Sequence, residues 1–436
     1  MRISGGPPPG FLKNQAEQDL QILVVVFFIQ VLLVIRTGFA SLFPFGYIGY
    51  TWLAALFLAA FGILIFSDRI VFSALQAKLL RSFSAGQAAI QRARNLFLFF
   101  TLLIVGLGLA ARCFVILTVP INVLTADMLP LIQKAVLAFQ SGQNPYQVYY
   151  FPYPMPLTFL PGLWLPYYPM ITLGLDPRWI GLLVWLLISA LLMWIILETG
   201  AKRRSPFYYL IGAIDIAMLQ FSPDLIAFHS IGHTFTLWLW LALVCFGIYK
   251  GWNILTAVGL GLVLSSRQTA VVFPPILLFY WFSQGGLRAA LKYSGITAAV
   301  FLLLNVPFAL QSPAQVFLAP LAHYQELAAW DLTRGPASFM ASSIGFSYVL
   351  QNWLGPKVLS FFYVLVILAT IGLTPYLVQN RKRMLLGLAA VLAWFNLFTP
   401  IPWTYIYYDS LIILAFALAI QGDNPASDAT ITTPAE

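Results

Sequence analysis

The polar residues most able to do chemistry in this sequence follow an apolar run that ends at residue 118. Asp127 stands there without an acidic neighbour, and it is followed by Gly-Gln-Asn-Pro-Tyr at 142–146 and by Tyr-Pro-Met-Pro at 153–156. A carboxylate of this kind can act as a general base toward a hydroxyl group. The alternative is a capping role, because a helix that begins near Met128 would place Pro130 in its first turn, where no N–H partner is needed. The two roles are compatible.

Further ionisable groups lie beside or within later apolar runs. Arg267 stands between two such runs, and a cation within a membrane is costly enough that it normally has a function or an ionic partner. Asp215, in the middle of an apolar run, is the candidate partner, although it could equally have a function of its own. For His233, capping or packing is the alternative to ligand binding. Asp409, in the outer turn of the last run, is either a group that binds an acceptor or an interfacial residue.

A polar segment between residues 312 and 356 holds His323, Glu326, Asp331 and Arg334. The commoner role of such groups is that of solvated loop charges, because surface ion pairs contribute little to stability. His323 and Arg334 remain candidates to bind an anion.

The composition decides which kind of protein positions these groups. The chain has 436 residues, of which 61% are hydrophobic and only 8% are charged, whereas soluble domains carry about 25% charged residues. A soluble enzyme, a disordered chain and a nucleic-acid-binding protein are therefore excluded. The two cysteines, Cys113 and Cys245, have no metal-ligand spacing, so the sequence predicts neither a metal site nor a cofactor.

Long apolar runs predict an all-α polytopic integral membrane protein of about 12 transmembrane helices with external juxtamembrane helices. The predicted spans are 21–37, 47–66, 96–118, 179–197, 206–222, 232–249, 252–265, 268–283, 293–311, 357–379, 384–399 and 403–421. Two further stretches, 155–173 and 338–354, are interrupted by prolines or polar residues. We expect these two to lie along the outer surface of the membrane.

The distribution of basic residues predicts the orientation. Clusters at 69–94, 202–204, 288–292 and 381–383 fall on one side only if neither interrupted stretch crosses the membrane. Since basic clusters mark cytoplasmic loops, both termini are expected in the cytoplasm and the site outside, in the plasma (inner) membrane.

The same orientation defines the expected domain organisation. Residues 1–94 form a tail, an extra transmembrane hairpin and a basic loop, residues 95–421 form the main membrane domain, and 422–436 form a polar tail. The external loops 119–178 and 312–356 hold most of the polar chemistry.

The order of Asp127, a helix, Gly-x-Asn-Pro-Tyr and Tyr-Pro-x-Pro resembles the first external loop of the glycosyltransferase-C superfamily. It is most similar to glycosyltransferase family 87, the polyprenyl-phosphate-mannose-dependent α-mannosyltransferases. Segments around Gly232-His233-Thr234, Ser266-Arg267-Gln268 and Gly335-Pro336-Ala337-Ser338 resemble later segments of that family. His233 stands where the family has Gln, and Arg267 where it has Lys. The resemblance covers roughly residues 95–420.

The resemblance implies an inverting transfer of a hexose such as mannose from a polyprenyl-phosphate-linked sugar donor to a hydroxyl of a lipid or glycan acceptor. Asp127 would deprotonate that hydroxyl. The leaving phosphate needs preorganised donors, for which the candidates are Arg267, Arg334, His233 and His323. We expect substrate contacts from Asn144, Tyr146, Tyr153 and Glu326. The expected partners are this donor, this acceptor and membrane lipid, without nucleic acid. The sequence has no Asp-x-Asp motif and no Gly-rich phosphate loop, which argues against a metal-bound nucleotide sugar.

Two other classes of function stay open. A transporter or lipid-linked glycan flippase usually shows internal repeats and charges near the middle of the membrane, and only Asp215 favours this class. A non-catalytic scaffold of the cell envelope would use the two external loops as partner surfaces. A scaffold should tolerate Asp127→Asn, and a transferase should not.

Overall fold

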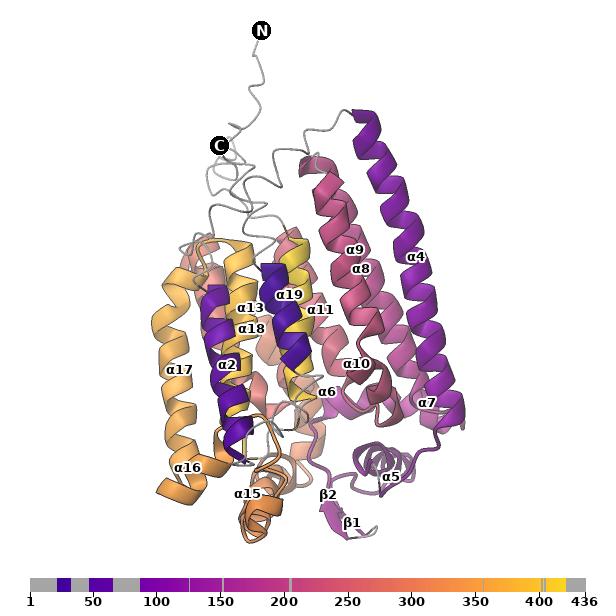
Figure 1. The fold of residues 1–436 in the computed structure, drawn as a ribbon. Coiled ribbons are helices and arrows are strands. Elements are labelled where there is room, and N and C mark those ends of the chain that lie inside the picture. The colour runs from indigo at the N-terminus through magenta and orange to yellow at the C-terminus, as the bar shows by residue number, and fades with distance from the viewer. Residues whose placement is uncertain are drawn as a thin grey trace.

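Helices make up most of the part of the chain that the structure describes. The computed structural model describes residues 22–32, 47–65, 87–124, 126–150, 153–203, 206–355, 357–400, 403 and 405–420. The long helices run side by side as a bundle, and the connecting elements that carry the candidate site gather at one end of it (Figure 1).

The predicted apolar runs are mainly helical where the structure describes them. The helices concerned are Ile22–Leu32, α2 (Tyr47–Ile65), α4 (Gln87–Thr118), α8 (Trp179–Arg203), α9 (Pro206–Phe221), α11 (Phe235–Lys250), α12 (Asn253–Leu264), α13 (Pro274–Ala309), α17 (Val358–Leu377), α18 (Arg381–Leu397) and α19 (Ile406–Ala419). Two predicted runs, 268–283 and 293–311, fall largely on the single element α13. The all-α prediction is therefore confirmed for the bundle.

The twelve membrane crossings are not confirmed. Five described helices are long and apolar enough to span a membrane, namely α2, α4, α8, α13 and α17, or six if the bent pair formed by α9 and the residues after it is one span. The helix α11 has 16 residues, and at about 1.5 Å per residue a helix of that length falls short of a hydrocarbon core of about 30 Å. Exposed apolar side chains such as Phe99 and Leu117 on α4 suit a lipid environment. These features indicate a membrane protein.

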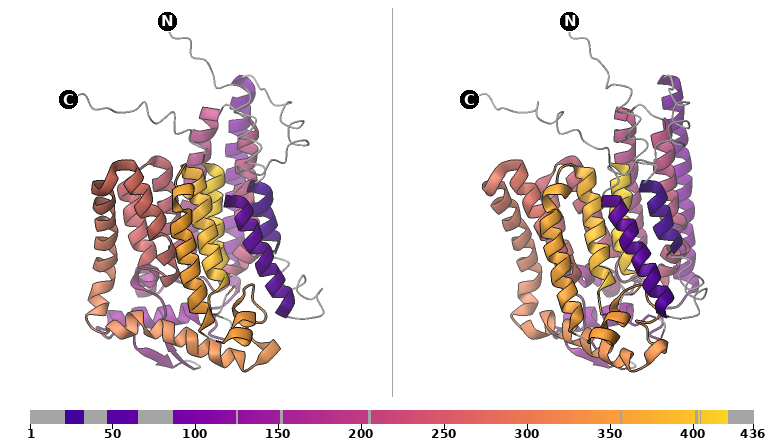
Figure 2. Two further views of the ribbon diagram at one scale, coloured as in Figure 1. Left: turned by 90° about the vertical axis from the view of Figure 1, so that its left-hand side faces the viewer. Right: turned by 60° about the vertical axis from the view of Figure 1, so that its left-hand side comes forward.

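A bend divides α13 into two arms. Gly285 (φ −155°, ψ 27°) and Gly286 (φ 64°, ψ −160°) leave the helical conformation, and the left-handed φ of Gly286 is one that side chains with a Cβ atom rarely adopt. The chain folds back there, so that the rings of Trp281 and Tyr293 lie 5.7 Å apart across the bend (Figure 2). The Gly-Gly pair thus separates the two arms of α13, which correspond to the two predicted runs.

A second break lies between α9 and α10 (Pro223–Ala227), where the chain bends by 45°. Pro223 cannot continue the hydrogen bonding of α9, so carbonyl groups at its end need other donors. Arg112 of α4 supplies them. Its Nη1 donates to the Gln220 carbonyl at 3.0 Å and its Nη2 to the Leu219 carbonyl at 3.0 Å. The guanidinium also lies over the ring of Trp185, and the short 3-10 helix η2 (Phe228–Ser230) then leads toward His233.

The two external loops fold into short elements at one end of the bundle (Figure 1). The first contains α5 (Met128–Gln140), the antiparallel strands β1 (Val148–Tyr150) and β2 (Pro154–Pro156), and then α6 (Pro161–Trp164), η1 (Leu165–Tyr167) and α7 (Tyr168–Thr172). The second contains α14 (Pro313–Phe317), α15 (Ala319–Leu332), η4 (Gly335–Ala337) and α16 (Ser347–Leu354). The interrupted stretch 155–173 is thus part strand and part short helix, and 338–354 is helical mainly over α16.

Basic side chains meet at the opposite end of the bundle. Glu198, near the end of α8, pairs with Lys202 of the same helix and with Lys250 at the end of α11. Arg381, the first residue of α18, donates to the Tyr249 carbonyl at 3.0 Å. The basic side chains of Lys202, Lys250 and Arg381 therefore share one end, away from the elements of the external loops.

Candidate active site

Asp127 occupies the N-cap position of α5, but its side chain makes no capping hydrogen bond. The carboxylate instead accepts a hydrogen bond at Oδ2 from the Tyr153 hydroxyl, 2.5 Å away. The capping alternative thus describes the position of the residue and not the use of its carboxylate. The Oδ1 atom has no hydrogen-bond partner in the described ranges, which leaves it able to accept a proton.

The β1–β2 hairpin brings Tyr153 to Asp127. Tyr150 pairs with Pro154 at the end of the hairpin, so the chain reverses immediately before Tyr153 and returns toward the start of α5. Burial, the hydrogen bond to Asp127 and the negative charge of that carboxylate together raise the pKa of the Tyr153 hydroxyl. The phenol therefore keeps its proton and donates a hydrogen bond to Asp127.

Arg267 forms a buried ion pair with Asp409, and not with Asp215 as the sequence suggested. Its Nη1 lies 2.9 Å from Asp409 Oδ2, and the indole Nε1 of Trp238 donates to Asp409 Oδ1 at 2.7 Å. The physical reason is the position of each acid along its helix. Asp409 lies in the first turn of α19, near the end of the bundle where Arg267 ends its own helix, whereas Asp215 lies in the middle of α9. Asp215 is 1% exposed, and its Oδ2 has no hydrogen-bond partner among the described residues.

Several polar groups around Arg267 lack partners in the described chain. The Arg267 guanidinium lies 5.7 Å from the centre of the Tyr405 ring, and the ring of His233 lies 5.0 Å from the same tyrosine. Neither ring nitrogen of His233 has a hydrogen-bond partner there, and neither does Nε2 of Gln268, the residue after Arg267. Buried donors without partners are costly. Together with Arg267, these groups are suited to a polar or anionic ligand.

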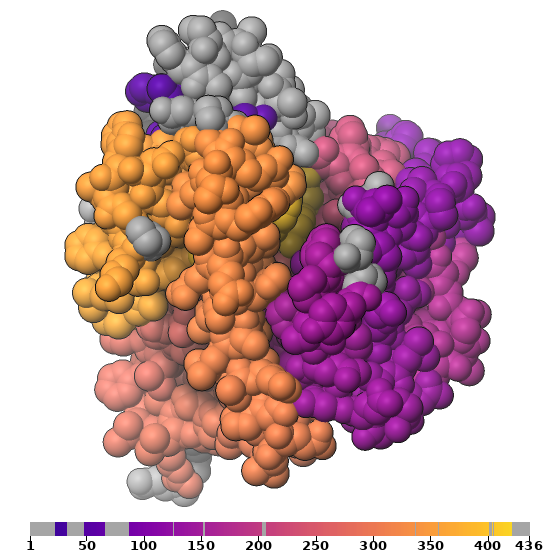
Figure 3. All heavy atoms as spheres, turned by 90° about the horizontal axis from the view of Figure 1, so that it is seen from below, coloured from indigo at the N-terminus to yellow at the C-terminus, as the bar shows by residue number. Residues whose placement is uncertain are grey.

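Tyr324 and Tyr405 relate the position of Asp127 to that of Arg267. The charges of Asp127 and Arg267 both act on each of these tyrosines, so both charged groups lie near the same two side chains. Tyr324 of α15 donates a hydrogen bond to Thr158 Oγ1 at 3.3 Å, and burial raises its pKa. Figure 3 shows this end of the molecule hollowed between the orange surface of α15 and the purple surface of the first external loop, with yellow residues near the C-terminal helix at its base.

The charge of Asp127 acts on the His323 imidazole, and the charge of Arg267 is not among the causes of its pKa shift. Burial lowers the pKa of the His323 imidazole, while the negative charges of Glu326 and Asp127 act to raise it. Burial prevails, so the ring carries no charge at neutral pH. Glu326 is exposed one helical turn further along α15. A neutral His323 can orient a ligand, but it does not supply the positive charge expected of it for a phosphate.

Arg334 is engaged in its own loop. Its Nη1 lies 3.7 Å from Asp331 Oδ1, and its guanidinium lies over the rings of Trp330 and Phe339. The buried Asp331 carboxylate also accepts the backbone N–H groups of Phe339 and Met340, each at 2.9 Å. Arg334 therefore belongs to a clamp after α15. In the part of the chain described, no contact joins it to Arg267 or Asp127.

Asn144 joins the two external loops, and Tyr146 stabilises the first of them. Asn144 Nδ2 donates to Ser312 Oγ at 2.8 Å and to Gln315 Oε1 at 3.0 Å, and so ties the first loop to the second. Tyr146 is 2% exposed, donates to the Phe159 carbonyl and accepts from Trp164 Nε1, both at 3.1 Å. The hydroxyl of Tyr146 is thus used within the fold, which favours a structural role for it over the expected substrate contact.

Four residues of the candidate site have roles that were not predicted from the sequence. Tyr405, Tyr324, Trp238 and Gln268 carry no spacing signal that separates them from the many other aromatic and polar residues of the chain. Gln268 could have been found by its position directly after Arg267. The others depend on which helices pack together, which periodicity does not reveal.

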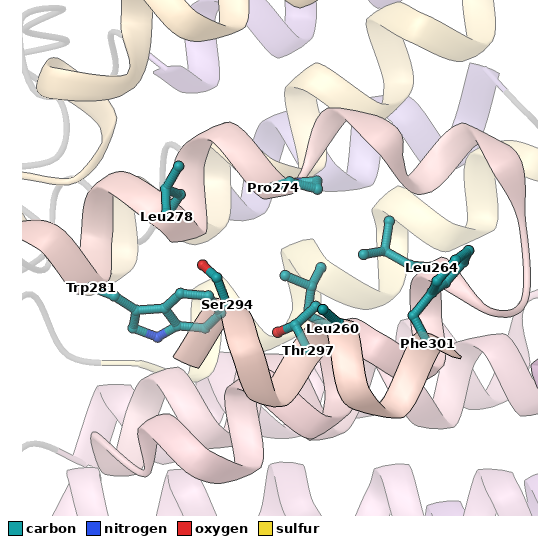
Figure 4. Close-up of a pocket in the computed structure, with 9 residues that line it drawn as sticks. Leu260, Leu264, Pro274, Leu278, Trp281, Ser294, Thr297 and Phe301 are labelled. Carbon is teal, nitrogen blue, oxygen red and sulfur yellow. The ribbon is translucent and has the colours of Figure 1, made fainter. Parts of the chain in front are cut away.

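An apolar groove of about 380 Å³ lies between α12 and the two arms of α13 (Figure 4). Its lining residues are Leu260, Leu264, Pro274, Leu278, Trp281, Ser294, Thr297, Ala298 and Phe301. None of the candidate site residues lines it. Its walls suit hydrocarbon and offer no acid, base or cation.

The described residues contain no group of three or more His, Cys, Asp or Glu side chains that could hold a metal ion. The groups found near Asp127 and Arg267 are tyrosines and imidazoles, beside the carboxylate and the buried guanidinium themselves. No family model, no curated protein and no solved structure matches this chain.

Proposed function

We propose that this protein is a membrane glycosyltransferase that moves a hexose from a polyprenyl-phosphate donor to a hydroxyl of a lipid or glycan acceptor. The observation that carries the proposal is the placement of Asp127. Its carboxylate is not used for capping, and its charge and that of the buried Arg267 act on the same two tyrosines, Tyr324 and Tyr405. A base for a hydroxyl and donors for a leaving phosphate are the two requirements of this reaction.

The proposed step balances as follows. The acceptor oxygen attacks the anomeric carbon while Asp127 Oδ1 takes the hydroxyl proton, and the bond from that carbon to the phosphate oxygen breaks with its electrons. The configuration inverts because attack and departure lie on opposite faces of the sugar. Tyr153 holds the other carboxylate oxygen. Arg267, with His233 and Gln268 beside it, stabilises the negative charge on the leaving phosphate.

The proposed orientation places this hollow outside the cytoplasm. Basic side chains of α8, α11 and α18 meet at the opposite end of the bundle, and such groups favour the cytoplasmic face. Nucleotide sugars are cytoplasmic, so a transferase that works outside needs a donor carried by a lipid. Mannose is the sugar that the resemblance to family 87 favours.

Asp215 supports a different function, that of a transporter, because an ionisable group buried within a span normally has a role. One experiment separates the two. A strain that lacks the gene is complemented with wild type, Asp127→Asn or Asp215→Asn at equal expression, and its glycolipids and glycans are profiled by mass spectrometry.

We expect the Asp127→Asn strain to accumulate a product one hexose shorter, and transfer by the purified variant to fall by at least about 100-fold, because loss of a general base costs that much. Asp215→Asn should leave the product unchanged. The opposite pattern would favour the transporter. Full activity of both variants would favour the scaffold.

A further inference from the structure

Asp409 is an acid paired with Arg267 that takes no part in the proposed step. We infer that Asp409, together with Trp238, is a positioning residue that holds the Arg267 guanidinium in the orientation needed to bind the donor phosphate. This inference rests on the proposed function, because it names how the anion-binding group of that same site is held.

The contacts of Asp409 leave its carboxylate no other task. Arg267 Nη1 occupies Oδ2 at 2.9 Å and Trp238 Nε1 occupies Oδ1 at 2.7 Å. The residue is 1% exposed, so a substrate would have to displace one of these contacts to reach it. An unpaired charge at such a depth is costly. The carboxylate is thus committed to the cation that follows α12 and to an indole from α11.

The pairing leaves one particular edge of Arg267 open. The ion pair with Asp409 is the single hydrogen-bonded contact of its side chain in the described ranges, and it uses Nη1 alone. Nε and Nη2 together form a planar fork of two parallel N–H groups, which matches two oxygens of a phosphate. Had Asp409 taken both Nη2 and Nε, that fork would be blocked.

The backbone and the aromatic neighbours restrict the guanidinium further. Arg267 is extended (φ −150°, ψ 137°) between α12 and the 3-10 helix η3 (Gln268–Val272), and its N–H bonds the Val263 carbonyl at 3.2 Å. The Tyr405 ring lies beside the guanidinium. The backbone, one nitrogen and one flank are thus held, and the charge of Arg267 acts on both His233 and Tyr324.

A structural role for Asp409 predicts a different pattern of mutational effects from a positioning role. An acid that merely ties α19 to α11 through Trp238 would matter equally with or without Arg267. A positioning residue acts through Arg267 and should lose its effect when Arg267 is absent. The test is therefore a double-mutant cycle on transfer by the purified full-length protein, with decaprenyl-phosphate-mannose as the donor.

We expect Arg267→Ala to lower kcat by at least about 100-fold and Asp409→Ala to lower kcat/KM for the donor by up to about 100-fold. Combined with Arg267→Ala, Asp409→Ala should cost no more than about twofold further. Asp409→Glu, which keeps the charge, should recover part of the loss. Equal losses in both backgrounds, or no loss in wild type, would overturn the inference.

Two further variants keep the test decisive if Asp409→Ala does not fold. Trp238→Phe removes only the indole donor to Oδ1 and should reproduce the donor effect in milder form, again only when Arg267 is present. Asp224→Asn is the matched control, since Asp224 accepts a hydrogen bond from Tyr408 at 3.0 Å, next to Asp409 in α19. It should change stability without a donor effect that depends on Arg267. An inactive wild type would overturn the proposed function itself, whereas additive effects in an active wild type would overturn only the positioning role.

Discussion

A histidine beside two carboxylates usually gains affinity for a proton, yet His323 has the opposite tendency. Burial lowers its pKa by more than the charges of Glu326 and Asp127 raise it. The half-buried ring is thus harder to protonate than a free imidazole. The positive charge available to a phosphate in the hollow is thus that of Arg267.

The lowered pKa of His323 predicts a dependence of stability on pH. An unfolded histidine has a pKa of about 6.5, so below that pH the unfolded chain binds a proton that the folded chain resists. Stability therefore falls as pH falls from about 6.5 toward the lower pKa of the folded state. Thermal unfolding in detergent should show a smaller loss between about pH 7.5 and about pH 5.5 for His323→Gln than for wild type. Parallel curves would contradict this assignment.

For individual residues, the sequence predicted which charged side chains matter better than it predicted which residues they contact. Asp127 and Arg267 could be selected because each is an isolated charge next to an apolar run. The partner of Arg267 could not, because Asp409 is 142 residues away and the pairing depends on how α12 and α19 pack. Asn144 and Tyr146 were selected by a motif. In the structure Asn144 joins the two loops and Tyr146 bonds within the first one.

Helices as elements follow directly from apolar runs, because a chain in hydrocarbon must satisfy its backbone internally. Their ends and joints depend on finer features. The Gly285–Gly286 bend joins two predicted runs into α13, and the break after α9 is held by Arg112, whose position in α4 gives no hint of its partners. The number of crossings could not be obtained from runs alone.

The bend in α13 makes a prediction about one glycine. Gly286→Ala should destabilise the protein by about 1–2 kcal/mol, because φ is +64° there and the position otherwise has open space around it. Gly295→Ala in the same helix is the control, since it also has open space and an ordinary helical conformation. Melting temperatures in detergent should fall for the first variant and stay level or rise for the second. Equal behaviour would mean that the bend does not depend on Gly286.

The molecule as a whole separates its polar chemistry from its basic end. The elements of the external loops lie at one end of the bundle, and the ion pairs of Glu198 lie at the other (Figure 1). Charge clusters could predict this separation because they depend on loop composition and not on packing. They could not predict the hollow, which forms where α15 meets the first external loop.

Cysteine labelling tests the orientation of the bundle. In a variant without Cys113 and Cys245, a cysteine placed at the exposed Gln143 should react with an impermeant thiol reagent in intact cells. A cysteine placed at Lys202, which is exposed at the other end, should react only after the cells are opened. The reverse pattern would place the hollow in the cytoplasm and remove the need for a lipid-borne donor.

The bridge from Asn144 to Ser312 and Gln315 has a consequence for how the protein responds to its bilayer. Both walls of the hollow are tied by side chains of the protein, at this bridge and again where Tyr324 meets Thr158. A thicker or thinner membrane changes the tilt of individual spans at a modest cost. That strain would fall on bends such as the one in α13. The distance between the two loops would stay fixed by the hydrogen bonds that join them. The geometry around Asp127 is thus insulated from the thickness of the lipid that surrounds it.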